Sequence, residues 1–178
     1  MSRRRIAAAV VAAVSGPPVA QAQTRPPKPA HARPTEVDQA RAAARPYAPT
    51  VRETSNRWGL PPHLLEALLW RESRFRPDAR HKRTKARGIG QFVPSGAAAV
   101  GRIQRERGVS RWFTYARAAD PIASIYAAAE FVAFLLDLCG GLSEAIGGYN
   151  SGRCGSNAFS RSVLRLADWL RAAEEPRT

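Results

Sequence analysis

Glu72 is the residue whose type and position best suit acid–base chemistry in this sequence. It follows Leu68 by four residues and Leu64 by eight, so on an α-helix it projects from the same face as these leucines. A carboxylate among apolar side chains loses hydration, which raises its pKa and suits a general acid working near neutral pH. Glu66 lies off this face, and we expect solvent around it. The alternative for Glu72 is an ion pair at the edge of the stripe with Arg71, Arg74 or Arg76.

Two glycine-containing segments further along the chain carry polar side chains that suit sugar binding. In Gly88-Ile89-Gly90-Gln91, the glycines allow a ligand close to the backbone, and the Gln91 amide can donate and accept hydrogen bonds. This combination fits a sugar with an N-acetyl group, although a plain turn is the simpler explanation. Tyr149 and Asn150 precede Gly152 and can hydrogen-bond a carboxylate or a sugar, while a helix C-cap explains them equally well.

The elements that must position these residues are predicted to be mainly α-helical, with little or no β-structure. From about residue 50 onward, apolar residues recur at helical spacing and no long alternating pattern occurs. We expect helices at about 61–73, 95–107, 122–138, 145–149 and 158–172. Pro61-Pro62 suits a first helical turn, and Asp120-Pro121 opens the third helix. Gly140-Gly141 ends that helix, and Ser143 can cap the next one.

The first 22 residues are typical of a secretory signal peptide. Arg3 to Arg5 are basic, residues 6–14 are apolar, and Ala20-Gln21-Ala22 is a small-residue cleavage site. A buried N-terminal helix is the alternative. We therefore expect an exported protein, either periplasmic or secreted.

Residues 23–49 are rich in proline and basic residues and are predicted to be a linker that does not fold against the domain. A short helix at 36–44 fits within this segment. Residues 50–178 then form one domain. No run of about 18 or more apolar residues occurs, so we expect no transmembrane segment.

The two cysteines, Cys139 and Cys154, are predicted to form a disulfide, because export implies an oxidising compartment. Two free buried thiols are the alternative. The cysteine spacing matches neither a metal site nor a CxxC redox centre. The three histidines, His31, His63 and His81, share no ligand spacing. We therefore expect no metal and no cofactor.

In their order along the chain, these segments resemble the soluble-type lytic transglycosylases, relatives of goose-type lysozyme. Glu72-Ser73 matches the Glu-Ser motif of that family, and residues 88–91 are similar to its Gly-Leu-Met-Gln motif. Residues 145–152 are similar to Ala-Leu-Ala-Ala-Tyr-Asn-Ala-Gly, and residues 120–125 resemble a segment that reads Asp-Pro-x-x-Asn-Ile. The resemblance covers roughly residues 50–155. Three positions depart from the family pattern: Gly90 stands for Met, Ser124 for Asn and Ala128 for Gly.

The resemblance implies a lysozyme-like α-helical domain that cleaves peptidoglycan between N-acetylmuramic acid and N-acetylglucosamine, forming 1,6-anhydromuramic ends. Glu72 would protonate the glycosidic oxygen and then, as a carboxylate, act as base on the muramic C6 hydroxyl. One carboxylate then suffices, where ordinary glycosidases need two. Tyr149 would orient Glu72 through a hydrogen bond. The residues implied to bind sugar or shape the site are Ser73, Gly88, Ile89, Gln91 and Asn150.

The chain is strongly basic, with a formal net charge of +14. Five basic residues flank the expected cleft, namely Arg80, Lys82, Arg83, Lys85 and Arg87. They can attract carboxylates of peptide stems, or they can form a simple solvated loop. Nucleic-acid binding is not expected, because the basic residues are spread over many segments and no recognition motif occurs.

Two other functions fit the same fold. A muramidase-type hydrolase needs a second carboxylate, for which Asp78, Asp120 and Glu130 are nearest in sequence. A non-catalytic cell-wall-binding or assembly factor is the other, and the intact Glu-Ser and Tyr-Asn pairs argue against it. The expected partner is the peptidoglycan glycan strand. Both wall turnover and work within an envelope-spanning secretion, conjugation or flagellar machine remain open.

Overall fold

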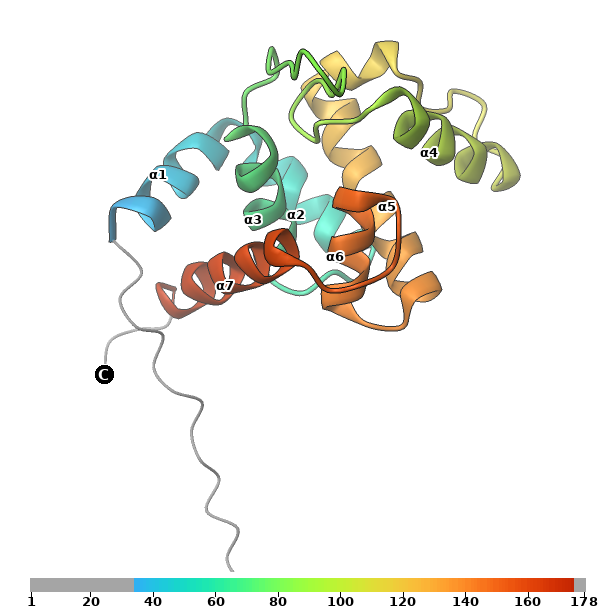
Figure 1. Cartoon of the computed structure of the whole chain (residues 1–178). Coiled ribbons are helices and arrows are strands. Elements are labelled where there is room, and N and C mark those ends of the chain that lie inside the picture. Colours follow the sequence, from blue (N-terminus) through green and yellow to red (C-terminus); the bar gives the residue numbers. More distant parts are fainter. Residues whose placement is uncertain (1–33, 175–178) are drawn as a thin grey trace, which may run out of the picture. The chain divides into compact units, whose positions relative to one another are not determined.

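The computed structural model describes residues 34–174, which are almost entirely helices and loops (Figure 1). The helices are α1 (Pro34–Ala44), η1 (Arg45–Tyr47, 3-10), α2 (Ala48–Arg57), α3 (Leu64–Ser73), α4 (Pro94–Glu106), η2 (Ala116–Ala119, 3-10), α5 (Pro121–Cys139), α6 (Leu142–Ser151) and α7 (Ala158–Ala172). Strand-like pairing among these residues consists of isolated bridges from Arg87 to Arg80 and to Phe92. The prediction of a mainly α fold is confirmed. The predicted signal peptide at 1–22 and residues 23–33 lie outside the described part of the chain.

Helix α3 packs against four other helices, and its leucine stripe is fully buried in the core. Leu64, Leu65, Leu68 and Leu69 are all 0–1% exposed. They pack between α1, α2, α5 and α7. The helix begins at Leu64, three residues later than predicted, because His63 adopts a left-handed conformation with φ of 60°. Pro61-Pro62 therefore belongs to the turn before the helix.

Helix α5 runs beside α6 and also packs against α2 and α4 (Figure 1). The Asp120 carboxylate accepts hydrogen bonds from the Ile122 and Ala123 amides, and Gly140 ends the helix with φ of 73°. Both ends therefore agree with the predicted signals. By length and composition alone, α5 could cross a membrane. Its apolar character is explained by its place in the core, where Ile125 and Val132 are fully buried.

The expectation that residues 23–49 form a linker is wrong for residues 34–49. Helix α1 packs against α3 and α7, and Val37, Ala40 and Ala44 are buried in the core. The Arg41 guanidinium also donates to the Leu170 carbonyl at 2.9 Å. These residues are part of the domain.

The prolines of this segment explain the error. Pro34 is the first residue of α1, and η1 and α2 each carry a proline in the first two positions. A missing N–H costs nothing in a first helical turn, so these prolines begin helices where a count of prolines suggests a linker.

The last two helices follow the disulfide-bonded end of α5. Helix α6 begins at Leu142 with Gly141 as its N-cap, so the predicted Ser143 cap is wrong. Ser143 instead lies within hydrogen-bond distance of Ser156 and Ser160. Helix α7 has the predicted bounds and begins with a capping box. It packs against α3 and α6.

Candidate functional site

Glu72 lies in the last turn of α3, on the face predicted from the leucine spacing. Its side chain keeps some contact with solvent, while protein surrounds the carboxyl group. Burial raises the pKa of Glu72 from 4.5 to about 8. Within residues 34–174, Glu72 has no ion pair and accepts no hydrogen bond from a side chain. A protonated carboxyl group at neutral pH follows from this environment.

The arginines that could have neutralised Glu72 are engaged elsewhere. Arg71 pairs with Glu36 of α1 at 2.7 Å. The Arg74 guanidinium lies 5.5 Å from the centre of the Trp70 ring, and the Arg76 Nε donates to the Ser73 carbonyl. The ion-pair alternative for Glu72 is therefore excluded in this structure.

Glu66 differs from its prediction as a solvated residue. Its side chain is 14% exposed, and one carboxylate oxygen lies 3.0 Å from the Nδ1 of His63. The neighbouring helices cover it, which helical periodicity within α3 alone does not reveal.

Ser73 joins helix α3 to the glycine loop. Its hydroxyl donates to the Ile89 carbonyl at 2.8 Å, and both residues are buried. The residue next to Glu72 in sequence thus holds residues 88–91 beside the end of α3. Ser73 and Ile89, both implied to bind sugar or shape the site, contact each other through this hydrogen bond.

The glycines of this loop are required by close packing. A Cβ at Gly88 would lie 1.7 Å from the Ala118 carbonyl oxygen, and Gly88 has φ of 76°. A Cβ at Gly90 would lie 2.7 Å from the Phe92 ring and 3.0 Å from the Tyr149 hydroxyl. The space next to this position, where the family pattern has Met, is occupied by these two aromatic side chains.

Ser124 is a residue of the site that the sequence predictions did not include. Its hydroxyl, fully buried in α5, accepts a hydrogen bond from the Gly90 amide at 3.0 Å. The signal was present in the segment that resembles Asp-Pro-x-x-Asn-Ile, because the polar residue there lies one helical turn after Asp120.

Gln91 uses part of its amide to hold the loop. With φ of 48°, its side-chain nitrogen donates to the Gly88 carbonyl at 2.9 Å and the Ala79 carbonyl at 3.2 Å. The side-chain carbonyl oxygen receives no hydrogen bond from residues 34–174. Gln91 therefore has an acceptor to offer to a ligand, while its donors stabilise the turn.

Tyr149 lies close to Glu72 but does not form the predicted hydrogen bond with it. Its hydroxyl donates to the Gly90 carbonyl at 2.8 Å. Burial, and then the negative charge of Glu72, raise the pKa of Tyr149 well above 10. The rings of Phe92 and Phe131 pack around Tyr149 at 5.9 and 5.6 Å between centroids. These contacts fix the position of the Tyr149 side chain near the carboxyl group of Glu72.

Asn150 is exposed, and its side chain forms no hydrogen bond within the described residues. Tyr149 and Asn150 belong to the last turn of α6, which continues to Ser151 and ends at Gly152 with φ of 78°. The helix predicted to end at residue 149 thus continues to Ser151, with Gly152 as its C-cap, and the side chain of Asn150 is available to a ligand.

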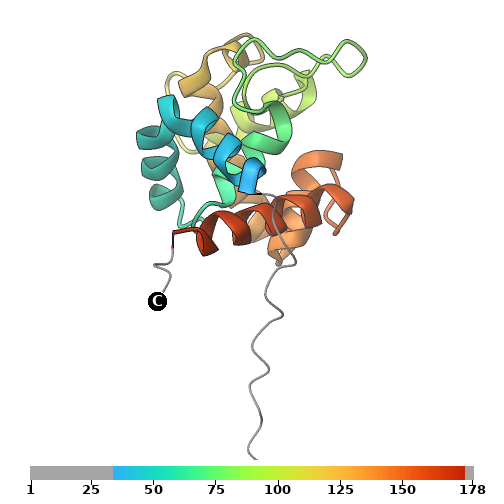
Figure 2. The same cartoon turned by 90° about the vertical axis from the view of Figure 1, so that its left-hand side faces the viewer.

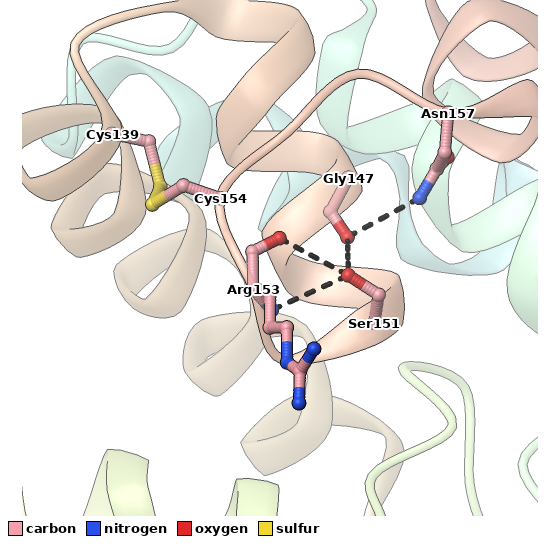
Figure 3. Close-up of a disulfide and its surroundings, with 6 residues drawn as sticks. All are labelled: Cys139, Gly147, Ser151, Arg153, Cys154 and Asn157. Atoms are coloured by element: carbon pink, nitrogen blue, oxygen red, sulfur yellow. Dashed lines mark hydrogen bonds between the residues drawn. A yellow bond between two sulfur atoms is a disulfide. The ribbon is translucent and has the colours of Figure 1, made fainter.

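The Cys139–Cys154 disulfide is present and joins the end of α5 to the loop after α6 (Figure 3). The Ser151 hydroxyl lies 2.8 Å from the Gly147 carbonyl and 3.1 Å from the Arg153 carbonyl. A Cβ at Gly147 would lie 1.8 Å from the Gly155 carbonyl oxygen, so this loop packs directly on α6. The disulfide and this packing fix the helix that carries Tyr149.

None of the three predicted second carboxylates is placed beside Glu72. Asp120 caps α5, and Glu130 pairs with Arg107 at 2.9 Å and Gln104 at 2.6 Å. Asp78 is exposed in the loop after α3. Burial is the cause of the shifted pKa of Glu72, with no contribution from another carboxylate. Among residues 34–174, no group of three His, Cys, Asp or Glu side chains could hold a metal ion.

A comparison with protein families places these elements in one known group. The family model of the transglycosylase SLT domain matches residues 49–169, which include Glu72, the 88–91 loop and Tyr149. A comparison with curated proteins gives no match. The family match spans more than half of the chain and all the elements of the site. The chain belongs to the transglycosylase SLT domain family.

Proposed function

We propose that this protein is an exported peptidoglycan lytic transglycosylase with Glu72 as its single acid and base. Membership of the family indicates a lytic-transglycosylase-type activity on peptidoglycan. The observation that carries the finer proposal is the carboxyl group of Glu72, which has no charged partner among residues 34–174 and a pKa of about 8. An acid with this pKa is mostly protonated at neutral pH and can donate its proton.

The proposed reaction begins with proton transfer from Glu72 to the glycosidic oxygen between N-acetylmuramic acid and N-acetylglucosamine. The bond from this oxygen to the anomeric carbon then breaks, and Glu72 is left as a carboxylate. The carboxylate takes the proton of the muramic C6 hydroxyl, whose oxygen attacks the anomeric carbon and closes the 1,6-anhydro ring. Glu72 is again protonated and no water is consumed, so a second carboxylate is not needed.

The surrounding residues support this reaction by holding the 88–91 loop in place next to Glu72. Ser73 holds Ile89, and Tyr149 and Ser124 hold the carbonyl and amide of Gly90. The loop is therefore fixed on both sides of Gly90, next to Glu72. We propose that the free carbonyl of Gln91 and the side chain of Asn150 bind the sugars. Tyr149 is a positioning residue, because its hydroxyl acts through Gly90.

The products distinguish this proposal from hydrolysis. Purified cell wall digested with the protein is expected to yield fragments with 1,6-anhydromuramic ends, read by mass spectrometry. Fragments with reducing muramic ends in their place would identify a muramidase. Neither kind of fragment, at any protein concentration, would favour a non-catalytic wall-binding or assembly factor.

Export is proposed from the order of basic, apolar and small residues in the first 22 positions. A disulfide in the domain fits an oxidising compartment, either the periplasm or the medium. The expected mature protein begins at Gln23, which N-terminal sequencing of the exported chain would check. A protein that keeps Met1 within the cell would contradict this part of the proposal.

A further inference from the structure

A small cavity lies on the outer side of the loop that carries the glycine motif. It has a volume of about 320 Å³. Its walls come from the segment after α3 and from the end of η2: Pro77, Asp78, Ala79, Arg80, Arg87 and Ala119. The loop between α3 and α4 (green), which provides most of these residues, extends away from the helices (Figure 2). A volume of this size falls within the range of small-ligand pockets.

Arg87 has an unused hydrogen-bond donor in this cavity wall. Its Nε is buried and has no acceptor within residues 34–174. Its guanidinium lies 5.2 Å from the centre of the Tyr115 ring, and the Tyr115 hydroxyl in turn donates to the Lys85 carbonyl. The side chain is thus held in place. Three buried side-chain donors lack an acceptor within residues 34–174, those of Arg71, Arg87 and Trp169. Arg87 is the one of the three that lines this cavity, so a ligand there would lie beside a side chain whose donors the protein leaves partly unpaired.

Arg80 provides a second guanidinium next to the first. Arg80 and Arg87 face each other in an antiparallel bridge, which brings the side chains of paired residues side by side. Neither arginine forms an ion pair within the described part of the chain. With Asp78 in the same wall, the cavity has a net charge of one positive unit. This balance suits a single carboxylate better than a phosphate-rich polymer, and a guanidinium binds a carboxylate through two parallel hydrogen bonds.

The cavity and the loop beside Glu72 share a residue. The Ala79 carbonyl accepts hydrogen bonds from the Gly88 amide at 2.9 Å and from the Gln91 side chain at 3.2 Å. A wall residue of the cavity is therefore hydrogen-bonded to the segment that we propose to contact sugar. In peptidoglycan, each glycan strand carries peptide stems with free carboxylates on its muramic residues.

We propose that Arg80 and Arg87 bind a carboxylate of the peptide stem, so that the enzyme recognises the peptide as well as the glycan. This inference rests on the proposed function, because it takes peptidoglycan as the substrate. Of the five basic residues in this loop, Arg80 and Arg87 thereby receive a binding role, whereas Lys82, Arg83 and Lys85 do not.

The test compares two substrates: glycan strands that carry stems, and the same strands after an amidase has removed the stems. Arg80→Gln combined with Arg87→Gln is expected to lower kcat/KM on stem-bearing strands about tenfold, the loss of roughly one charge-assisted contact. Cleavage of stem-free strands by the same variant is expected to stay unchanged.

The matched control is Lys82→Gln combined with Arg83→Gln. Lys82 and Arg83 lie in the same loop, and the double substitution removes the same charge as the cavity variant. Neither residue lines the cavity. Loss of long-range attraction alone would make the control as slow as the cavity variant on stem-bearing strands. That result, or an equal loss on both substrates, would overturn the inference.

A binding measurement separates this inference from the proposed reaction. Calorimetric titration with a free stem tetrapeptide measures the affinity of the cavity for the peptide, even in a variant that cleaves no glycan. We expect binding by the unmodified protein and by Glu72→Gln, and at least about tenfold weaker binding by Arg80→Gln, whose exposed side chain leaves the fold intact. Equal affinity in Arg80→Gln overturns the carboxylate site, whereas absent cleavage with intact binding overturns only the reaction.

Discussion

Glu130 of α5 and Glu72 of α3 both lie largely within the protein, but their surroundings differ. Glu130 of α5 accepts hydrogen bonds from Arg107 and Gln104. Glu72 of α3 has no partner of this kind among residues 34–174, and its pKa is raised to about 8. A buried carboxylate whose charge is satisfied by a cation and a donor suits a structural role, whereas one without them suits proton exchange. This difference underlies our proposal that Glu72 is the chemical acid and Glu130 a structural one.

The largest expected effect is on catalysis, in Glu72→Gln. The amide has almost the same shape and cannot donate the acid proton, so cleavage of cell wall should fall by about 10²–10⁴-fold. Release of anhydromuropeptides would be measured by chromatography and mass spectrometry. Glu66→Gln is the matched control on the same helix, since Glu66 contacts His63, and it should cleave normally. Normal cleavage by Glu72→Gln would show that Glu72 is not the acid of the reaction.

The next effect is on the pH dependence of stability. Folding raises the pKa of Glu72 from 4.5 to about 8, so the folded protein binds this proton more tightly than the unfolded chain. Stability from this group is complete below pH of about 4.5 and is lost as the pH rises towards 8, by about 1.4 kcal/mol per unit of pKa difference. The free energy of unfolding, measured by urea denaturation at several pH values in this range, should fall more steeply with pH in the unmodified protein than in Glu72→Gln. Parallel curves for the two proteins would contradict the raised pKa.

Glu130→Gln should affect stability and leave the chemistry intact. Loss of the negative charge weakens the hydrogen bonds from Arg107 and Gln104, and we expect the free energy of unfolding to fall by about 1–3 kcal/mol. Denaturant unfolding measures this loss, and cleavage at a temperature well below the transition should be unchanged. A variant that unfolds normally but cleaves slowly would assign Glu130 to the reaction and revive the two-carboxylate hydrolase.

The smallest expected effect is that of Tyr149→Phe. It removes the hydrogen bond to the Gly90 carbonyl and keeps the packing against Phe92 and Phe131. One neutral hydrogen bond contributes about 1 kcal/mol, so kcat should fall by about fivefold to tenfold. Because Tyr149 acts through the loop, the upper pH limb of activity set by Glu72 should stay near pH 8. A shifted limb would mean that Tyr149 acts on Glu72 directly.

Local features of the chain gave reliable predictions. The leucine spacing placed Glu72 on the buried face of α3, and the Asp120 and Gly140 signals located α5. The bounds of α7 were also correct. Each of these depends on contacts within a few residues, which helical periodicity and capping encode directly.

Features that depend on distant segments were predicted less well. The linker assignment allowed a short helix at 36–44 but missed its packing on the domain, because the burial of Val37 and Ala40 is provided by α3 and α7. The Tyr149 hydroxyl was assigned to Glu72 and instead donates to Gly90. Ser124 was noted as a departure from the family pattern, but its role in the site was not predicted, since its partner lies 34 residues earlier in the chain.

The sequence alone determined that an acid would stand on an apolar helix face, with a glycine loop and a Tyr-Asn pair later in the chain. Tertiary structure decided that none of the three neighbouring arginines pairs with this acid: Arg71 is paired with Glu36, Arg74 stacks on Trp70, and Arg76 binds a backbone carbonyl. The physical reason is that side-chain direction follows from local helix geometry, whereas the pairing of a charge depends on which distant segments compete for its neighbours.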